Sequence, residues 1–100
     1  MEPEIRRHDA LDRYELLLDG TVVSYVDFHD DGDRVTFPHT VTSPQYQGRG
    51  FAATVVRAAL DDMRAADKAV VPRCWFVAQF IDENPEYRDL LASDDASAGG

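Results

Sequence analysis

The sequence contains little cysteine, few positive charges and no long hydrophobic run. Cys74 is the only cysteine, which excludes an internal disulfide framework and a cysteine-rich zinc site. No segment approaches the roughly 20 consecutive apolar residues that a membrane-spanning helix needs. The first residues also lack the apolar stretch of a secretory signal. We therefore expect a cytoplasmic protein that does not enter a membrane.

The shortage of positive charge also restricts the possible partners. Ten lysines and arginines stand against nineteen acidic residues, which gives a formal net charge of −9. Binding to nucleic acid depends largely on cations placed against phosphates, so we expect no nucleic-acid partner. The excess of acid is explained by a solubilising surface or by a cationic partner such as an amine. The acidic pairs Asp61-Asp62 and Asp94-Asp95 are not accompanied by further metal-ligating residues, so no metal is predicted.

The first half of the chain has the pattern of an antiparallel meander. Residues 1–12 are polar and are expected to form an irregular lead-in. Residues 14–18 and 21–28 are rich in apolar, β-branched and aromatic residues, and Asp19-Gly20 between them is a typical hairpin turn. After a second turn, residues 34–41 are predicted to form a third strand. Its alternation places Val35, Phe37, His39 and Val41 on one face.

The second half has helical periodicity. Apolar residues in 51–66 recur at helical spacing, and residues 69–71 form a short apolar strand candidate. A strand, a helix and a strand in this order indicate a parallel βαβ pair. Residues 75–81 are expected to be helical, with Trp75, Phe76 and Phe80 in the core, and a last helix begins after Asn84 as its N-cap.

The predicted fold class is therefore α/β: a mixed sheet with an antiparallel meander, followed by a βαβ unit and C-terminal helices. Residues 13–91 form the expected domain. Residues 92–100 are rich in Ala, Ser, Asp and Gly, and are expected to form a disordered tail.

The loop between the third strand and the first helix is the most informative segment. Gly48 and Gly50 allow the backbone to approach a ligand closely, and Arg49 adds a positive charge. The free amides of such a loop lie at the positive end of the helix dipole, which favours an anion such as a phosphate. A tight turn into a helix explains the same glycines without a ligand. The spacing fits neither the dinucleotide fingerprint nor a P-loop.

This segment resembles the coenzyme A signature of GNAT-type N-acetyltransferases, in which Gln or Arg is followed by Gly three positions on and by Gly or Ala two positions later. The matching residues are Gln47, Gly50 and Ala52. The resemblance covers about residues 13–91 and implies a GNAT-like fold with acetyl-CoA as cosubstrate. The residues it implies for binding acetyl-CoA are Val41, Thr42, Gln47, Gly48, Arg49, Gly50, Phe51, Ala52 and Asn84.

Further residues resemble a branch of very short proteins of this family. They are His39-Thr40, the Pro-x-Cys element that ends at Cys74, and Asn84-Pro85-Glu86-Tyr87. The branch usually carries His where this chain has Asn84. The chain also lacks the first helices that larger members place over the acceptor. A second copy could complete such a site, so a monomer and a homodimer both stay open.

Acetyl transfer to an amine requires removal of a proton. An alkylammonium group with a pKa near 10.4 is about three units above neutrality, so freeing its lone pair costs roughly 4–5 kcal/mol. His39 is the candidate general base, or else a core histidine. Cys74 either accepts the acyl group or packs beside the thioester. The resemblance implies that Tyr87 protonates the departing thiolate, and ordinary helix packing is its alternative.

The sequence thus predicts an acetyl-CoA-dependent N-acetyltransferase that acts on an amine acceptor, with His39, Cys74 and Tyr87 as catalytic candidates. The alternative function is a non-catalytic module that binds acyl-CoA or a nucleotide, or that mediates interactions. A third reading treats the glycine loop as a plain turn in an adaptor domain.

Overall fold

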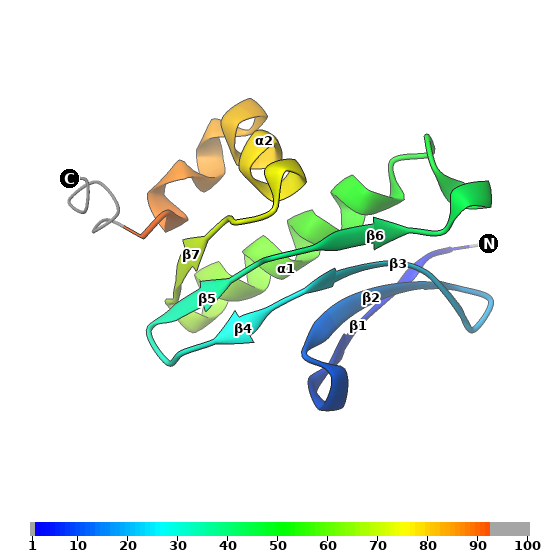
Figure 1. The fold of residues 1–100 in the computed structure, drawn as a ribbon, viewed down its shortest axis with the longest axis horizontal. Helices are drawn as coiled ribbons and strands as arrows, with labels where there is room; N and C mark the ends of the chain where they lie inside the picture. The colour runs from blue at the N-terminus through cyan, green and yellow to red at the C-terminus, as the bar shows by residue number, and fades with distance from the viewer. Residues whose placement is uncertain (1, 93–100) are drawn as a thin grey trace.

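The computed structural model describes residues 2–92 and has a mixed α/β fold (Figure 1). Its strands are β1 (Glu4–His8), β2 (Arg13–Leu18), β3 (Thr21–Asp27), β4 (His29–Asp30), β5 (Arg34–Thr36), β6 (Thr40–Thr42) and β7 (Ala69–Val71). Its helices are α1 (Phe51–Ala66) and α2 (Trp75–Glu83), with 3-10 segments η1 (Asp9–Leu11), η2 (Pro44–Tyr46) and η3 (Pro85–Leu90). Within residues 2–92, no helix has the length and apolar character needed to cross a bilayer.

The strands form two hydrogen-bonded groups that share one continuous segment of chain. The first is antiparallel with the order β1-β2-β3-β6, and the second has the order β4-β5-β7. In the second group β5 and β7 are parallel. Because β5 and β6 follow each other along the chain, this segment passes from one group to the other (Figure 1). The predicted α/β class, with a meander and a parallel pair joined through a helix, is confirmed.

The hairpin between β2 and β3 follows from local sequence. Asp19 and Gly20 both have positive φ angles, 53° and 82°, and Leu18 pairs with Thr21 across the turn. A two-residue turn of this kind matches the twist of the flanking strands, which is why Asp-Gly predicts it. The hairpin prediction is confirmed.

Helix α1 supplies one side of the core. Its buried residues are Val55, Val56, Ala59, Leu60 and Met63, which is the predicted stripe. They belong to one core cluster with Tyr14, Leu16 and Val26 of the sheet. The helix ends at Asp67, whose left-handed backbone lets its amide donate to Arg64 and Met63.

The third predicted strand is not continuous, and this changes which side chains share a face. Val26 pairs with Thr40, and His29 pairs with Thr36. From Val26 to His29 is three residue steps, whereas from Thr36 to Thr40 is four, so one extra residue interrupts the alternation. Pro38 lies in this interruption and has no amide proton to donate to a strand ladder. The prediction that His39 and Val41 share the buried face of Val35 and Phe37 is therefore wrong.

The N-terminal segment also differs from its prediction. The described part of residues 1–12 is not irregular, because β1 pairs with β2 along its whole length and η1 follows it. Most of its side chains are charged, so the segment lacks the alternation of apolar residues that would predict a strand. The partner of the segment is the buried carboxylate of Glu15, which accepts hydrogen bonds from Arg6 at 2.6 Å and is within 3.1 Å of His8. Charged side chains are common on edge strands, because they discourage pairing with a strand of another chain.

Two expectations about the C-terminal helices need correction. The segment after Asn84 is a 3-10 helix, and the Asn84 side chain does not cap it but donates to the carbonyl of Phe80 at 2.8 Å. Trp75, expected in the core, is exposed, whereas Phe80 is buried. The predicted tail lies, from residue 93 onward, outside the described residues. Ala92 is still held to the sheet, since its amide donates to the carbonyl of Val70.

Candidate functional site

A gap opens where the parallel pairing of β5 and β7 ends. The last bonds across this pair are from the Phe37 amide to the Val71 carbonyl at 3.0 Å and from the Cys74 amide to the Phe37 carbonyl at 2.9 Å. Beyond them β6 continues along β3, while the chain after Cys74 turns into α2. The two segments diverge over the first turn of α1 (Figure 1).

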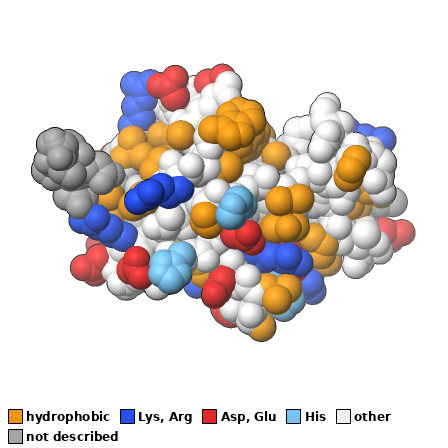
Figure 2. All heavy atoms as spheres, in the orientation of Figure 1, with side chains coloured by type: hydrophobic (Ala, Val, Ile, Leu, Met, Phe, Trp, Pro, Cys, Tyr) orange, Lys and Arg blue, Asp and Glu red, His pale blue; other side chains and the backbone are white. Residues whose placement is uncertain are grey.

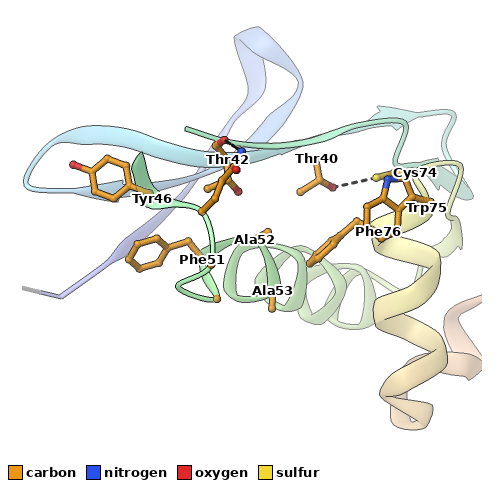
Figure 3. A pocket seen from close by; sticks show the side chains of 12 residues that line it. Thr40, Thr42, Tyr46, Phe51, Ala52, Ala53, Cys74, Trp75 and Phe76 are labelled. Carbon is orange, nitrogen blue, oxygen red and sulfur yellow. Dashed lines mark hydrogen bonds between the residues drawn. The ribbon is translucent and has the colours of Figure 1, made fainter. Parts of the chain in front are cut away.

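The gap holds a pocket of about 470 Å³. Its walls come from β6, the loop before α1, the first turn of α1 and the start of α2 (Figure 3). The lining residues are Thr40, Thr42, Tyr46, Gln47, Gly48, Gly50, Phe51, Ala52, Ala53, Cys74, Trp75 and Phe76. Because β6 and the segment after Cys74 diverge instead of pairing, a space is left between them.

One end of the pocket is lined by backbone amides. Gly48 and Gly50 have φ angles of 81° and 82°, which L side chains rarely adopt. The first amide of α1 with a backbone acceptor is that of Thr54, which donates to the Gly50 carbonyl at 3.1 Å. Within the described chain, the amides of residues 48–53 have no backbone acceptor. Free amides at the positive end of a 16-residue helix suit an anionic group.

The loop is fixed to the sheet and flanked by unneutralised charge. The Gln47 side chain donates to the Thr42 carbonyl at 3.2 Å, which ties the loop to β6. Arg49 and Arg73 lack a carboxylate partner among residues 2–92, although the chain has an excess of acid. Arg49 lies in the loop over the ring of Tyr46, and Arg73 precedes Cys74. Arg49 thus supplies positive charge within the glycine loop, between the lining residues Gly48 and Gly50.

The other end of the pocket contains the buried thiol. The Cys74 sulfur donates to the Thr40 hydroxyl across 3.4 Å (Figure 3). Cys74 is the residue before α2, and Trp75 and Phe76 follow it on the pocket wall. The small side chains of Ala52 and Ala53 form the floor on α1 (Figure 3). A slender ligand can therefore extend from the amides to the thiol.

His39 lies on the other face of β6. Its side chain is 73% exposed, and its Nδ1 is 3.8 Å from a carboxylate oxygen of Asp27. Val41 alternates with Thr40 and Thr42 and is exposed on the same outer face. From the side on which β5 and β6 pass in front of α1, acidic, basic and histidine side chains are interspersed among hydrophobic ones (Figure 2). Neither His39 nor Val41 is part of the pocket lining.

Tyr87 is also outside the pocket. It is buried on η3, where its hydroxyl donates to Asp61 at 2.7 Å and accepts from Arg57 at 3.1 Å. Burial and the hydrogen bond to Asp61 raise the pKa of Tyr87, and Arg57 opposes this only in part. The hydroxyl is thus engaged with α1 rather than directed to Cys74.

Asn84 lines a second hollow of about 450 Å³ that shares Ala53, Trp75 and Phe76 with the pocket. The structure therefore groups Cys74 with six of the predicted binding residues, namely Thr42, Gln47, Gly48, Gly50, Phe51 and Ala52. Arg49 borders this group, and Asn84 lies in the adjoining hollow. His39, Val41 and Tyr87 are not brought into it.

Sequence reasoning missed some lining residues. Thr40 was part of a motif but was not assigned to the site, and its strand alternation with Thr42 is the signal that would have found it. Trp75 and Phe76 follow Cys74 directly, but only tertiary packing decides which way they face. Within residues 2–92, no group of three His, Cys, Asp or Glu side chains is arranged to hold a metal ion.

Solved structures show the same fold. A GCN5-like protein from Staphylococcus aureus superposes with a TM-score of 0.70 at 15% identity, covering 89% of this chain and 87% of that one. The ribosomal-protein-alanine N-acetyltransferase from Brucella melitensis biovar Abortus 2308 superposes with a TM-score of 0.58 at 18% identity, covering 81% and 61%. At these identities the likeness establishes the fold alone.

Sequence comparison identifies the family. Protein NATD1 from Bos taurus is 37% identical over 51 residues, or 51% of this chain and 45% of that protein, and the Homo sapiens protein is 35% identical with the same coverage. The chain thus spans just under half the length of these curated relatives. The family model described as GCN5-related N-acetyl-transferase matches residues 13–90. Because this match includes most of the described chain, the protein belongs to the GCN5-related N-acetyltransferase family.

Proposed function

We propose that the chain binds acetyl-CoA in the pocket between β6 and α2 and transfers the acetyl group to an amine. The observation that carries this proposal is one pocket that joins free amides at the start of α1 to a buried thiol at the start of α2. The family of the chain supports the same chemistry. Acetyl-CoA supplies an activated acyl group as a thioester.

The residues present fit this cosubstrate. The amides of residues 48–53 match the negative charge of a pyrophosphate, and Arg49 adds a cation beside them. Ala52 and Ala53 leave room for a narrow chain, and Thr40 and Thr42 offer hydroxyl groups along β6. In this arrangement the acyl end lies beside Cys74.

The acceptor amine approaches on the outer face of β6 and reaches the acyl group through the gap between β6 and the segment after Cys74. His39 is next to Thr40 in sequence but projects to that face, where Asp27 lies 3.8 Å away. In the proposed reaction His39 takes the proton of the amine, and the carboxylate of Asp27 lies within ion-pair distance of the imidazole. The new C–N bond forms as the C–S bond breaks, and CoA leaves as a thiolate that takes its proton from water. The net charge of −9 favours the approach of a cationic acceptor.

Cys74 has a supporting role in this proposal. Its thiol is buried and donates to Thr40, so it shapes the acyl end of the pocket instead of attacking the thioester. A covalent acyl-cysteine is the competing chemistry. It predicts an added acetyl mass on the protein.

A second function is a binding module without transferase activity. The observation that favours it is the position of His39 and Tyr87, since neither contributes to the pocket lining. Such a module would bind acyl-CoA as a signal or as cargo.

Calorimetric titration with acetyl-CoA, followed by incubation with a panel of amines, tests the proposal. Binding together with an acetylated amine supports the transferase. Binding without any acetylated amine supports the binding module. Intact-mass measurement in the same samples detects an acetyl adduct, and its loss in Cys74→Ala would establish the covalent route. Absence of binding would reject both functions.

A further inference from the structure

The side chain of Trp75 is much more exposed than a residue that contributes to the hydrophobic core. It is 73% exposed, more than any other large hydrophobic residue in the described chain. Its ring contacts only the edge of Phe76 among the aromatic residues described, with centroids 5.9 Å apart. Within residues 2–92 the indole N–H has no hydrogen-bond acceptor. Tryptophan contributes most when it is buried and its N–H is paired, so this side chain stabilises the free protein little.

The position of Trp75 connects it to the pocket. It is the first residue of α2 and follows Cys74 directly. It lines both the pocket and the adjoining hollow, together with Ala53 and Phe76. Figure 3 shows its ring beside Cys74, on the same side of the pocket as Phe76. An exposed indole at the border of two hollows is placed to contact whatever fills them.

We propose that Trp75 is a ligand-contacting residue that covers the pantetheine arm of bound acyl-CoA. This inference rests on the proposed function. The arm combines apolar carbon chain with two amide groups, and an indole offers an apolar face with one N–H donor. The amides that suit the pyrophosphate lie at the other end of the pocket, at residues 48–53. Trp75 therefore contacts the arm near the acyl group and not the nucleotide.

Fluorescence tests the contact directly because Trp75 is the only tryptophan in the chain. Wild-type protein is titrated with CoA and, separately, with adenosine 3′,5′-bisphosphate, which lacks the arm, while calorimetry records binding. We expect CoA to move the emission of Trp75 to shorter wavelength, because the ring leaves water, and the nucleotide at saturation to leave it unchanged. CoA binding without an emission change overturns the role of Trp75 and leaves the proposed function standing. An emission change with the nucleotide alone also overturns it.

Variants test the energetic contribution. Trp75→Ala is expected to weaken CoA binding by about tenfold and to leave binding of adenosine 3′,5′-bisphosphate unchanged. Trp75→Phe keeps a ring and should stay within about threefold of wild type. Leu11→Ala is the matched control, because Leu11 is also an exposed apolar residue and lies in η1. Equal CoA affinity in Trp75→Ala and wild type contradicts the inference. No CoA binding by the wild type would reject the inference and the proposed function together.

Discussion

The thiol of Cys74 donates to the hydroxyl of Thr40 across 3.4 Å and so links two segments 34 residues apart in sequence. Thr40 begins β6 and Cys74 precedes α2, and these are the two segments that diverge to form the pocket. Their contact closes the pocket at the end away from the glycine loop. Under the proposed function, the thioester of bound acetyl-CoA lies beside this thiol, while His39, the neighbour of Thr40 in sequence, projects to the opposite face of β6.

The Cys74→Ala variant tests whether the thiol only lines the pocket or takes part in acetyl transfer. If the thiol only shapes the acyl end, Cys74→Ala should keep CoA affinity within about threefold and lower acetyl transfer by about tenfold. Loss of a small buried side chain should lower the free energy of unfolding by about 1 kcal/mol. Calorimetry, amine acetylation and urea unfolding measure the three effects. Complete loss of transfer with unchanged CoA affinity would contradict this supporting role and favour a covalent acyl-cysteine, whereas wild-type turnover would show that the thiol does not shape the acyl end.

Gly50→Asp should abolish CoA binding. The substitution introduces negative charge beside the amides of residues 48–53, and it strains a backbone with φ of 82°. Gly32→Asp is the matched control, because Gly32 also has positive φ and open space around its Cα but lies in the turn before β5. Both variants should lose similar stability, and only Gly50→Asp should lose affinity, by about a hundredfold or more. CoA binding by Gly50→Asp at wild-type strength would reject the amide site.

His39→Ala should lower acetyl transfer by about a hundredfold, since general-base catalysis typically contributes that much or more. The affinity for CoA should change little, because His39 is outside the pocket lining. His29→Ala is the matched control, since His29 is also exposed and lies 3.0 Å from the carboxylate of Asp31. Amine acetylation assays on both variants, with calorimetric CoA titrations beside them, measure the two effects. Equal rates in the two variants would exclude His39 as the base.

Tyr87→Phe distinguishes packing from proton donation. The hydroxyl donates to Asp61, so its loss should lower the free energy of unfolding by about 1 kcal/mol and leave acetyl transfer unchanged. Burial and Asp61 raise the pKa of Tyr87 above its ordinary value of 10.0. Its stabilising effect is therefore present below about pH 10 and is lost as the pH rises further. A large fall in transfer with unchanged folding would instead support the role of proton donor.

In the Glu15→Gln variant, the free energy of unfolding should fall less steeply than in wild type as the pH is lowered. Burial alone raises the pKa of Glu15, but hydrogen bonds from Arg6, Arg13 and His8 outweigh it and lower the pKa from 4.5 to about 2. The carboxylate thus stabilises the fold above about pH 4.5, by on the order of 3 kcal/mol, and this is lost as the pH falls towards 2. Urea unfolding from pH 7 to pH 3 measures the slope. Glu4→Gln, an exposed change in β1, should keep the wild-type slope.

The predictable parts of the fold are those set by neighbours in sequence. Asp19-Gly20 specifies its turn because few other residues adopt its backbone angles, and the α1 stripe follows from helical spacing. The glycine loop of residues 47–52 was found in the same way, because its free amides result from the start of a helix. β1 was missed because most of its own side chains are charged, and its pairing with β2, including the contact of Arg6 with Glu15, leaves no hydrophobic pattern in the segment.

The sequence by itself determined the fold class, the glycine loop and the thiol at the start of α2, since each depends on local backbone preference or on residue identity. Only the tertiary structure decided which side chains meet there. One extra residue near Pro38 turns His39 to the outer face and Thr40 into the pocket, and this register depends on strand partners distant in sequence. Tyr87 faces Asp61 for the same kind of reason, because the packing of η3 on α1 fixes its direction.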